Sequence, residues 1–399
     1  MTSTNTENIN QGDASEFTLK TVEGLGNLIR VTDSDEDTGL QLYCYVKCDS
    51  DDKGPIRECR GVVFHGPDII MKAFPYAPEY NEYQTEELER DIGPILKDSV
   101  IFDAHEGALI RMFFFLDKWY TSTHRKLNAF KSKWASRDSF GTLFKRALES
   151  EVKNNTTLRE SMLENDKSLL ERFQDTLDID KQYMFLVRNN ADNRIVSQPP
   201  ETPTVYHVGT FVGGKLSTDI NCNIPTPTKH SFERLDGLRD YVGNTDYNEK
   251  QGVIVFAPNN SQFKIVNRTY QDLFEARGNE PSIKFRYLQV RLNPSMVNRL
   301  YHLYPNMIAK FDEYEDTIYE IGKFIYYSYV ERYIRKEHVI VPPEEFNVMK
   351  KCHAHYLADK SNNKINMEKV MVIINEQSST SINHMIRHYI ENQKKNNSV

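Results

Sequence analysis

The chain has 399 residues, 39% hydrophobic and 11% aromatic, so two or three folded domains are expected and long disorder is excluded outside the ends. Its formal net charge of −7 is uneven, because residues 1–40 carry eight Asp or Glu against two Lys or Arg, and the near-neutral remainder does not exclude a nucleic-acid partner. Five scattered cysteines, no signal peptide and no run of about 18 apolar residues predict a soluble, reduced, cytoplasmic protein without a membrane span.

The N-terminal half is predicted to contain strands followed by helices. Residues 1–16 are polar and aperiodic, which predicts a disordered leader. Residues 17–74 contain short β-type runs separated by Asp, Gly and Pro: NLIRVT, LQLYCYVK, RGVVFH and DIIMKAF. An acidic turn at residues 103–107 precedes two further predicted strands, 108–116 and 118–123. Residues 125–177 are predicted to be helical.

Strands return after residue 180 and then give way to helices. The β-type runs are QYMFLVR, NRIVSQ, TVYHVGTFVGGK, GVIVFA and QFKIVN. From Tyr270 onward the pattern is helical, with prolines between the segments. The predicted fold class is therefore α+β. A mainly antiparallel β domain with flanking helices is expected at residues 17–270, and an all-α domain at 271–399.

Residues 110–146 form a basic stretch in an otherwise acidic protein. They hold nine Lys or Arg against two Asp, with interleaved aromatic and histidine side chains at Trp119, Tyr120, His124 and Trp134. Cations that follow phosphates and rings that stack on bases are typical of single-stranded nucleic-acid binding. The candidate RNA-binding residues are Arg125, Lys126, Lys131 and Lys133. The alternative is that these residues form a solvated helix face.

Five short segments, in this order, resemble the nucleotidyltransferase motifs of phage-type RNA ligases. They are CRGVVF at residues 59–64, HEG at 105–107, NRIV at 193–196, GVIV at 252–255 and FKIV at 263–266. The resemblance covers roughly residues 40–270 and is closest to variants encoded by large DNA viruses. It implies an RNA-ligase-like nucleotidyltransferase domain that uses ATP and Mg²⁺. It also implies a nucleotide pocket containing Arg60, Glu106, Gly107 and Lys264.

The sequence departs from this family at four positions. In such enzymes a lysine amine attacks the α-phosphate of ATP, and carboxylates and cations hold the metal and the phosphates. Here the nucleophile's position is Ala104, so ordinary lysine adenylylation at this position is excluded. The acidic residues of the third and fourth motifs fall on Met184 and Gln251, and the second lysine of the fifth falls on Val266. No catalytic residue and no metal ligand is predicted.

Three functional hypotheses remain open from the sequence. The first is an RNA ligase-like protein that acts on RNA ends, for instance ends that are already adenylylated. The second is a non-catalytic descendant that binds RNA, or a protein partner through the helical domain. The third is a structural viral protein. RNA and a nucleotide are the predicted partners.

Overall fold

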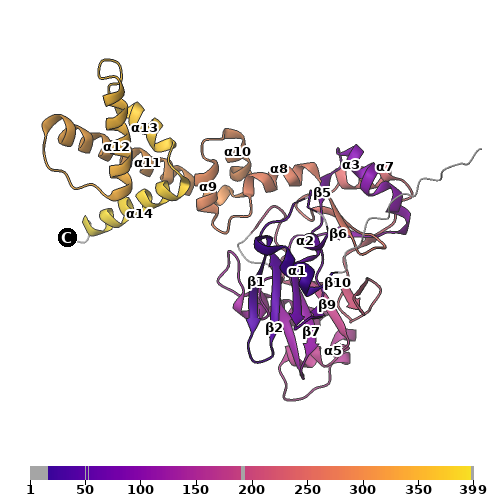
Figure 1. Cartoon of the computed structure of the whole chain (residues 1–399). Helices are drawn as coiled ribbons and strands as arrows, with labels where there is room; N and C mark the ends of the chain where they lie inside the picture. Colours follow the sequence, from indigo (N-terminus) through magenta and orange to yellow (C-terminus); the bar gives the residue numbers. More distant parts are fainter. Residues whose placement is uncertain (1–16, 50, 53, 190–193, 397–399) are drawn as a thin grey trace, which may run out of the picture. The chain divides into compact units, whose positions relative to one another are not determined.

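The computed structural model describes residues 17–49, 51–52, 54–189 and 194–396, and the predicted disordered leader at residues 1–16 lies outside them. The chain divides into two compact units, the first ending at Gln271 and the second beginning at Asp272 (Figure 1). The first unit combines three sheets with short helices, and the second is helical. This architecture confirms the α+β class.

Three sheets make up most of the first unit. One has the order β1 (Ile29–Asp35), β2 (Leu40–Tyr45), β3 (Arg60–His65), β4 (Asp68–Met71). The second has the order β11 (Lys215–Ser217), β10 (Thr204–Val212), β9 (Lys181–Arg188), β7 (Ala108–Phe115), β8 (Lys118–Ser122). The third has the order β12 (Lys229–His230), β6 (Val100–Ala104), β13 (Gly252–Phe256), β14 (Gln262–Val266), β5 (Glu79–Asn81). Neighbouring strands are antiparallel except for β14 and β5, which are parallel.

The core of the first unit decides which way β6 presents its side chains. Phe102 on β6 packs edge-to-face on Phe256 of β13, with ring centroids 6.0 Å apart, in a cluster that also holds Phe113 of β7. Ile101 on the same strand belongs to a different cluster, which includes side chains of α3 (Thr85–Asp91) and α7 (Leu235–Gly243). Because side chains alternate along a strand, Ala104 lies on the same face as Phe102.

The remaining helices of the first unit are α1 (Leu19–Gly24), α2 (Pro55–Glu58), α4 (Phe140–Asn154), α5 (Thr156–Ser161) and α6 (Leu169–Gln174), with 3₁₀ turns at Gly26–Leu28, Gly93–Asp98 and Ala129–Lys131. The predicted helix at residues 125–138 is therefore wrong except for one 3₁₀ turn. Asp33 accepts hydrogen bonds from Leu127 N at 2.8 Å and Lys126 Nζ at 3.2 Å, and Asn128 Oδ1 accepts one from Phe130 N. Such side-chain bonds compete with helical hydrogen bonding.

The second unit is helical, as the sequence predicts. Its helices are α8 (Arg268–Arg277, which begins in the first unit), α9 (Ile283–Val290), α10 (Pro294–Leu303), α11 (Ile308–Tyr329), α12 (Pro343–Ala358), α13 (Met367–Asn375) and α14 (Ser379–Asn396). A 3₁₀ turn at Pro305–Met307 precedes α11, and a π-helical turn at Val330–Arg335 follows it. In the described part of the chain, no helix combines the length and the apolar character needed to cross a bilayer.

Candidate functional site

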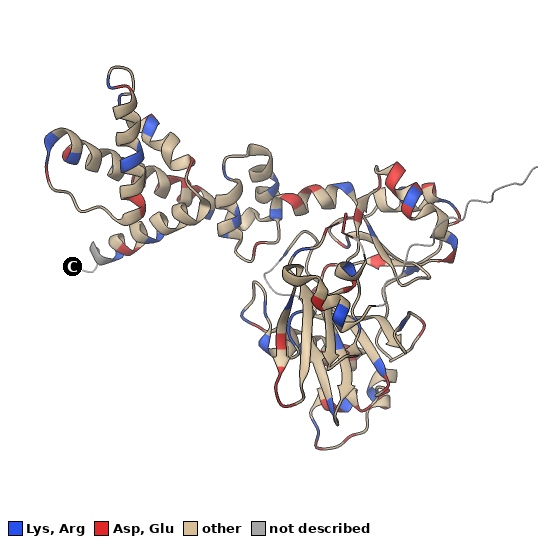
Figure 2. Cartoon of the chain, viewed as in Figure 1, with Lys and Arg blue, Asp and Glu red and all other residues tan. Residues whose placement is uncertain are grey.

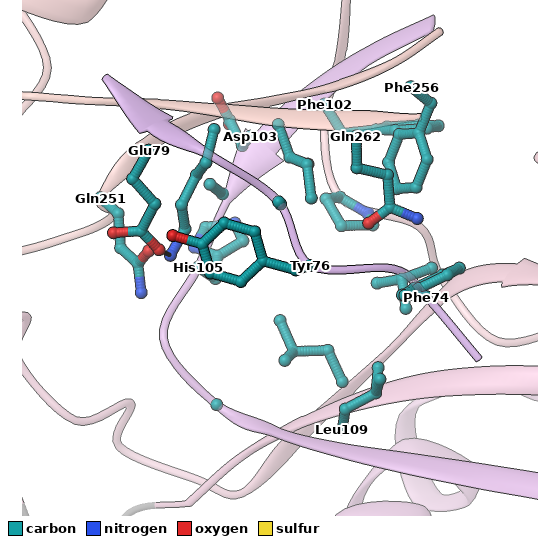
Figure 3. Close-up of a pocket in the computed structure, with 18 of the residues that line it drawn as sticks. Phe74, Tyr76, Glu79, Phe102, Asp103, His105, Leu109, Gln251, Phe256 and Gln262 are labelled. Atoms are coloured by element: carbon teal, nitrogen blue, oxygen red, sulfur yellow. Dashed lines mark hydrogen bonds and ion pairs between the residues drawn. The ribbon is translucent and has the colours of Figure 1, made fainter. Parts of the chain in front are cut away.

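A cavity of about 300 Å³ lies where the second and third sheets of the first unit face each other. Three of the predicted nucleotide-site residues, Arg60, Gly107 and Lys264, line it together with Ala104. Figure 3 shows Phe74, Phe102, Phe256 and Gln262 toward one end, and Glu79, His105 and Gln251 toward the other, with Tyr76 between them. The cavity thus has an aromatic end and a polar end.

The pleat of the third sheet explains which side chains reach the cavity. On β14, Phe263 and Ile265 belong to the cluster beneath α3 and α7, whereas Gln262 and Lys264 line the cavity. Alternation along the strand requires this division. The same rule places the methyl group of Ala104 on the cavity face of β6, where the resemblance would place a lysine amine.

The two cations of the cavity differ in their surroundings. Lys264 Nζ donates to Glu79 Oε1 at 2.8 Å, across the parallel β14–β5 pair, so its charge is largely neutralised. Arg60 has no ion pair among the described residues. It stands at the start of β3, next to Gly61, whose φ of +91° only glycine adopts readily. Arg60 is therefore the cation most available to an anionic ligand.

Two buried amides in the cavity wall lack hydrogen-bond partners within the described residues. Gln251 is 7% exposed and its Oε1 is unpaired, while Gln262 is 2% exposed and its Nε2 is unpaired. A buried polar atom without a partner costs about 1–3 kcal/mol. One acceptor and one donor are therefore available to a bound molecule.

Glu106, the fourth predicted residue, does not line the cavity. Its Oε1 accepts hydrogen bonds from Val196 N at 2.8 Å and Ser197 N at 2.9 Å, and Tyr270 contributes a side-chain hydrogen bond. Burial raises the pKa of the Glu106 carboxyl despite these donors. The predicted strand at residues 193–198 is wrong for residues 194–198, where the N–H groups of Val196 and Ser197 donate to Glu106 instead of to a strand partner. Asn193 lies outside the described residues.

Residues on either side of Glu106 also have structural reasons for their identity. A Cβ on Gly107 would lie 2.6 Å from Val187 O, so glycine lets β7 approach β9 closely. The ring of His105 stacks on Tyr206, with centroids 5.2 Å apart and planes 12° apart. Burial lowers the pKa of His105 to about 4, so the ring is neutral at neutral pH. It therefore offers the cavity a neutral ring.

A polar network on the opposite face of β6 was not predicted from the sequence. Asp103 accepts hydrogen bonds from Lys250 Nζ and Tyr241 OH, both at 2.8 Å, and His230 Nε2 lies 2.9 Å away. Burial opposes protonation of Lys250, but its bonds to Asp103 and Tyr241 outweigh this and raise its pKa. This lysine is therefore a protonated, paired cation.

No family model matches the chain. The chain is 33% identical over 321 residues to the immediate-early protein ICP-46 homolog of Invertebrate iridescent virus 6. The aligned region covers 75% of this chain and 67% of that protein. The chain belongs to the ICP-46 family. A second ICP-46 homolog, from Invertebrate iridescent virus 3, is 30% identical over 348 residues, covering 83% of this chain and 73% of the relative.

Among solved structures, this ICP-46 family member is similar to an archaeal ATP-dependent RNA ligase. The TM-score is 0.41 and the identity 12%, over 76% of this chain and 78% of that one.

The basic stretch of this ICP-46 family member lies apart from the residues that line the cavity. Arg125, Lys131 and Lys133 are exposed, and Lys126 pairs with Asp33. Two of the four interleaved rings of the stretch are packed inward: Tyr120 is 7% exposed, and Trp119 packs against the core and the ring of Phe114. Figure 2 shows acidic and basic residues interspersed along the first unit. The sequence interpretation of these rings as base-stacking groups is wrong for Tyr120, whose ring is buried, and stays a prediction for Trp119, which is partly buried.

Proposed function

We propose that this chain is a ligase-like protein that binds an adenine nucleotide, or the adenylylated 5′ end of an RNA, without forming a lysine adduct at position 104. The observation that carries the proposal is the cavity around Ala104. Its volume of about 300 Å³ combines an aromatic end with one arginine that has no ion pair and two buried amides that each have an atom without a hydrogen bond, counting partners in the described part of the chain. Arginine suits phosphate, amides suit a base or ribose, and rings suit a stacked base.

The nearby lysines do not replace the missing nucleophile. The amine of Lys264 is held by Glu79 at 2.8 Å, and that of Lys250 by Asp103 on the opposite face of β6. The raised pKa of Lys250 keeps that amine protonated, and a protonated amine has no lone pair with which to attack phosphorus. Binding without covalent capture is the chemistry that remains. ATP with Mg²⁺ is the first ligand to test.

Equilibrium binding of ATP, AMP and a 5′-adenylylated RNA to the full chain tests the proposal. Arg60→Ala should weaken binding about 10–100-fold, because a hydrogen bond to a charged group contributes about 1.5–3 kcal/mol. Arg30→Ala is the matched control, since Arg30 is an exposed arginine on strand β1 of the same sheet. Equal affinity of the Arg60→Ala and Arg30→Ala variants for all three ligands would overturn the proposal.

A second candidate function is sealing of RNA ends that are already adenylylated. The presence of Arg60 in the cavity favours it, because that cation would stabilise the AMP leaving group. The chain would then join a pre-adenylylated 5′ end to a 3′ hydroxyl in the absence of ATP. If the chain joins these RNA ends no faster than they join in buffer, the sealing function is refuted and only the binding function remains.

RNA binding by the basic stretch is a separate part of the proposal. Affinity for single-stranded RNA should fall as salt rises, with a log–log slope that reflects the number of phosphate contacts. Changing both Lys131 and Lys133 to alanine should reduce that slope by about 1–2. A slope that does not change would remove this stretch from the RNA site. A protein partner for the helical unit stays a prediction.

A further inference from the structure

Helices α12 and α14 of the second unit bring two carboxylates and two imidazoles together. Glu344 and Glu345 lie in the first turn of α12, while His384 and His388 are four residues apart on α14 and therefore share one face of that helix. One oxygen each of Glu344 and Glu345 and one ring nitrogen of His388 all lie within 4.8 Å of one another. This cluster belongs to the helical unit, so it is independent of the cavity around Ala104.

The distances from His388 to the two carboxylates are longer than those of good hydrogen bonds. His388 Nδ1 lies 3.5 Å from Glu345 Oε2 and 3.8 Å from Glu344 Oε2. A charge-assisted N–H···O bond has its heavy atoms about 2.7–2.9 Å apart. By contrast, two ligands that each bind zinc at about 2.1 Å in a tetrahedral arrangement lie about 3.4 Å from each other. The observed spacing fits ligands around a shared ion better than a direct hydrogen bond.

Burial supplies a second, independent observation. Glu345 is 3% exposed, and neither its Oε2 nor His388 Nδ1 has a hydrogen-bond partner among the described residues. A buried carboxylate oxygen that accepts no hydrogen bond, beside a second carboxylate and 3.5 Å from His388 Nδ1, is destabilising unless a cation compensates it.

We propose that Glu344, Glu345 and His388 form a binding site for a divalent transition-metal ion of the zinc type. Three protein ligands leave a fourth position for water. An imidazole ligand disfavours Mg²⁺ and Ca²⁺, which prefer oxygen ligands alone. His384 is a positioning residue: its Nδ1 lies 3.1 Å from Glu344 Oε1 and so holds the carboxylate with Oε2 toward the ion. The ion joins α12 to α14.

Cobalt titration of the metal-stripped full chain tests the site. One equivalent of Co²⁺ should bind and produce the visible absorption of a low-coordinate N/O site, and Zn²⁺ should displace it. His388→Gln should abolish this spectrum, and His384→Gln should weaken binding about 10–100-fold. His355→Gln, a histidine on α12 outside the cluster, should leave binding unchanged.

Two results would overturn the proposal. One is a wild-type chain that takes up no stoichiometric Co²⁺ or Zn²⁺, and the other is a His388→Gln variant that binds as the wild type does. If circular dichroism shows that His388→Gln has lost its helices, Glu344→Gln serves instead, because Glu344 is less buried than Glu345. Unchanged Co²⁺ affinity in a helical Glu344→Gln variant would equally contradict the site.

Discussion

Replacing Glu106 with alanine should destabilise the first unit of this protein. The Glu106 carboxylate holds two main-chain N–H groups, those of Val196 and Ser197, at 2.8 and 2.9 Å. These bonds fix the segment at residues 194–197, which has no strand partner there. Without the carboxylate, both N–H groups lose their acceptor.

The expected loss of unfolding free energy in Glu106→Ala follows from the number of hydrogen bonds that the carboxylate accepts. A hydrogen bond to a charged group contributes about 1.5–3 kcal/mol, so two give roughly 3–6 kcal/mol. Because burial raises the pKa of Glu106, the ionised carboxylate is itself disfavoured, and the lower end, about 3 kcal/mol, is expected. Glu106→Gln keeps an acceptor oxygen but loses the charge, so it should cost about half as much.

Urea denaturation followed by tryptophan fluorescence measures this unit alone. The chain has two tryptophans, Trp119 and Trp134, and both lie in the first unit. Glu249→Ala is the control, since Glu249 is an exposed residue near the same segment and its change should stay within about 0.5 kcal/mol of the wild type. If Glu106→Ala unfolds within about 1 kcal/mol of the wild type, Glu106 does not hold the segment as inferred.

Three further predictions concern single residues. The hydrogen bond from Tyr120 lowers the pKa of Asp35 from 3.8 to about 2. The ionised Asp35 therefore stabilises the fold fully above pH 3.8, and this contribution is lost as the pH falls toward 2. Asp35→Asn should reduce the loss of unfolding free energy between these two pH values, as measured by denaturation at each pH. Gly61→Ala should destabilise the first unit by about 2–5 kcal/mol in urea unfolding, because the new Cβ would lie 2.6 Å from the main chain of His124 at a positive φ. Since the pKa of His105 is about 4, nucleotide affinity measured calorimetrically should not respond to titration of this ring between about pH 6 and pH 8.

The sequence predicts the strands better than the loops between them. Near-continuous runs of apolar residues, rich in β-branched and aromatic side chains, mark β3, β9 and β13 correctly, because these strands are largely buried. The run after β8 has good helix formers, but Asp33, on another strand, accepts a bond from Leu127 N and keeps the segment irregular. That contact is tertiary, and no local pattern reveals it.

The candidate sites also depend on tertiary contacts that no local sequence pattern reveals. Arg60, Ala104 and Lys264 are far apart in the sequence, and only the resemblance to ligases suggested that they meet. Glu106 matches a motif, yet its carboxylate faces a main-chain segment that the sequence predicts as a strand. The metal cluster had one local signal, the spacing of two histidines on α14, but its carboxylates come from α12.

The most direct test of the proposed function is incubation of the full chain with labelled ATP and Mg²⁺, analysed in two ways. Under native conditions, saturable binding is predicted that Arg60→Ala weakens. After denaturing electrophoresis, no label should remain on the protein, because position 104 has a methyl group where an amine would be needed. A labelled band that survives denaturation, or the absence of any native binding, would contradict non-covalent nucleotide binding in the cavity around Ala104.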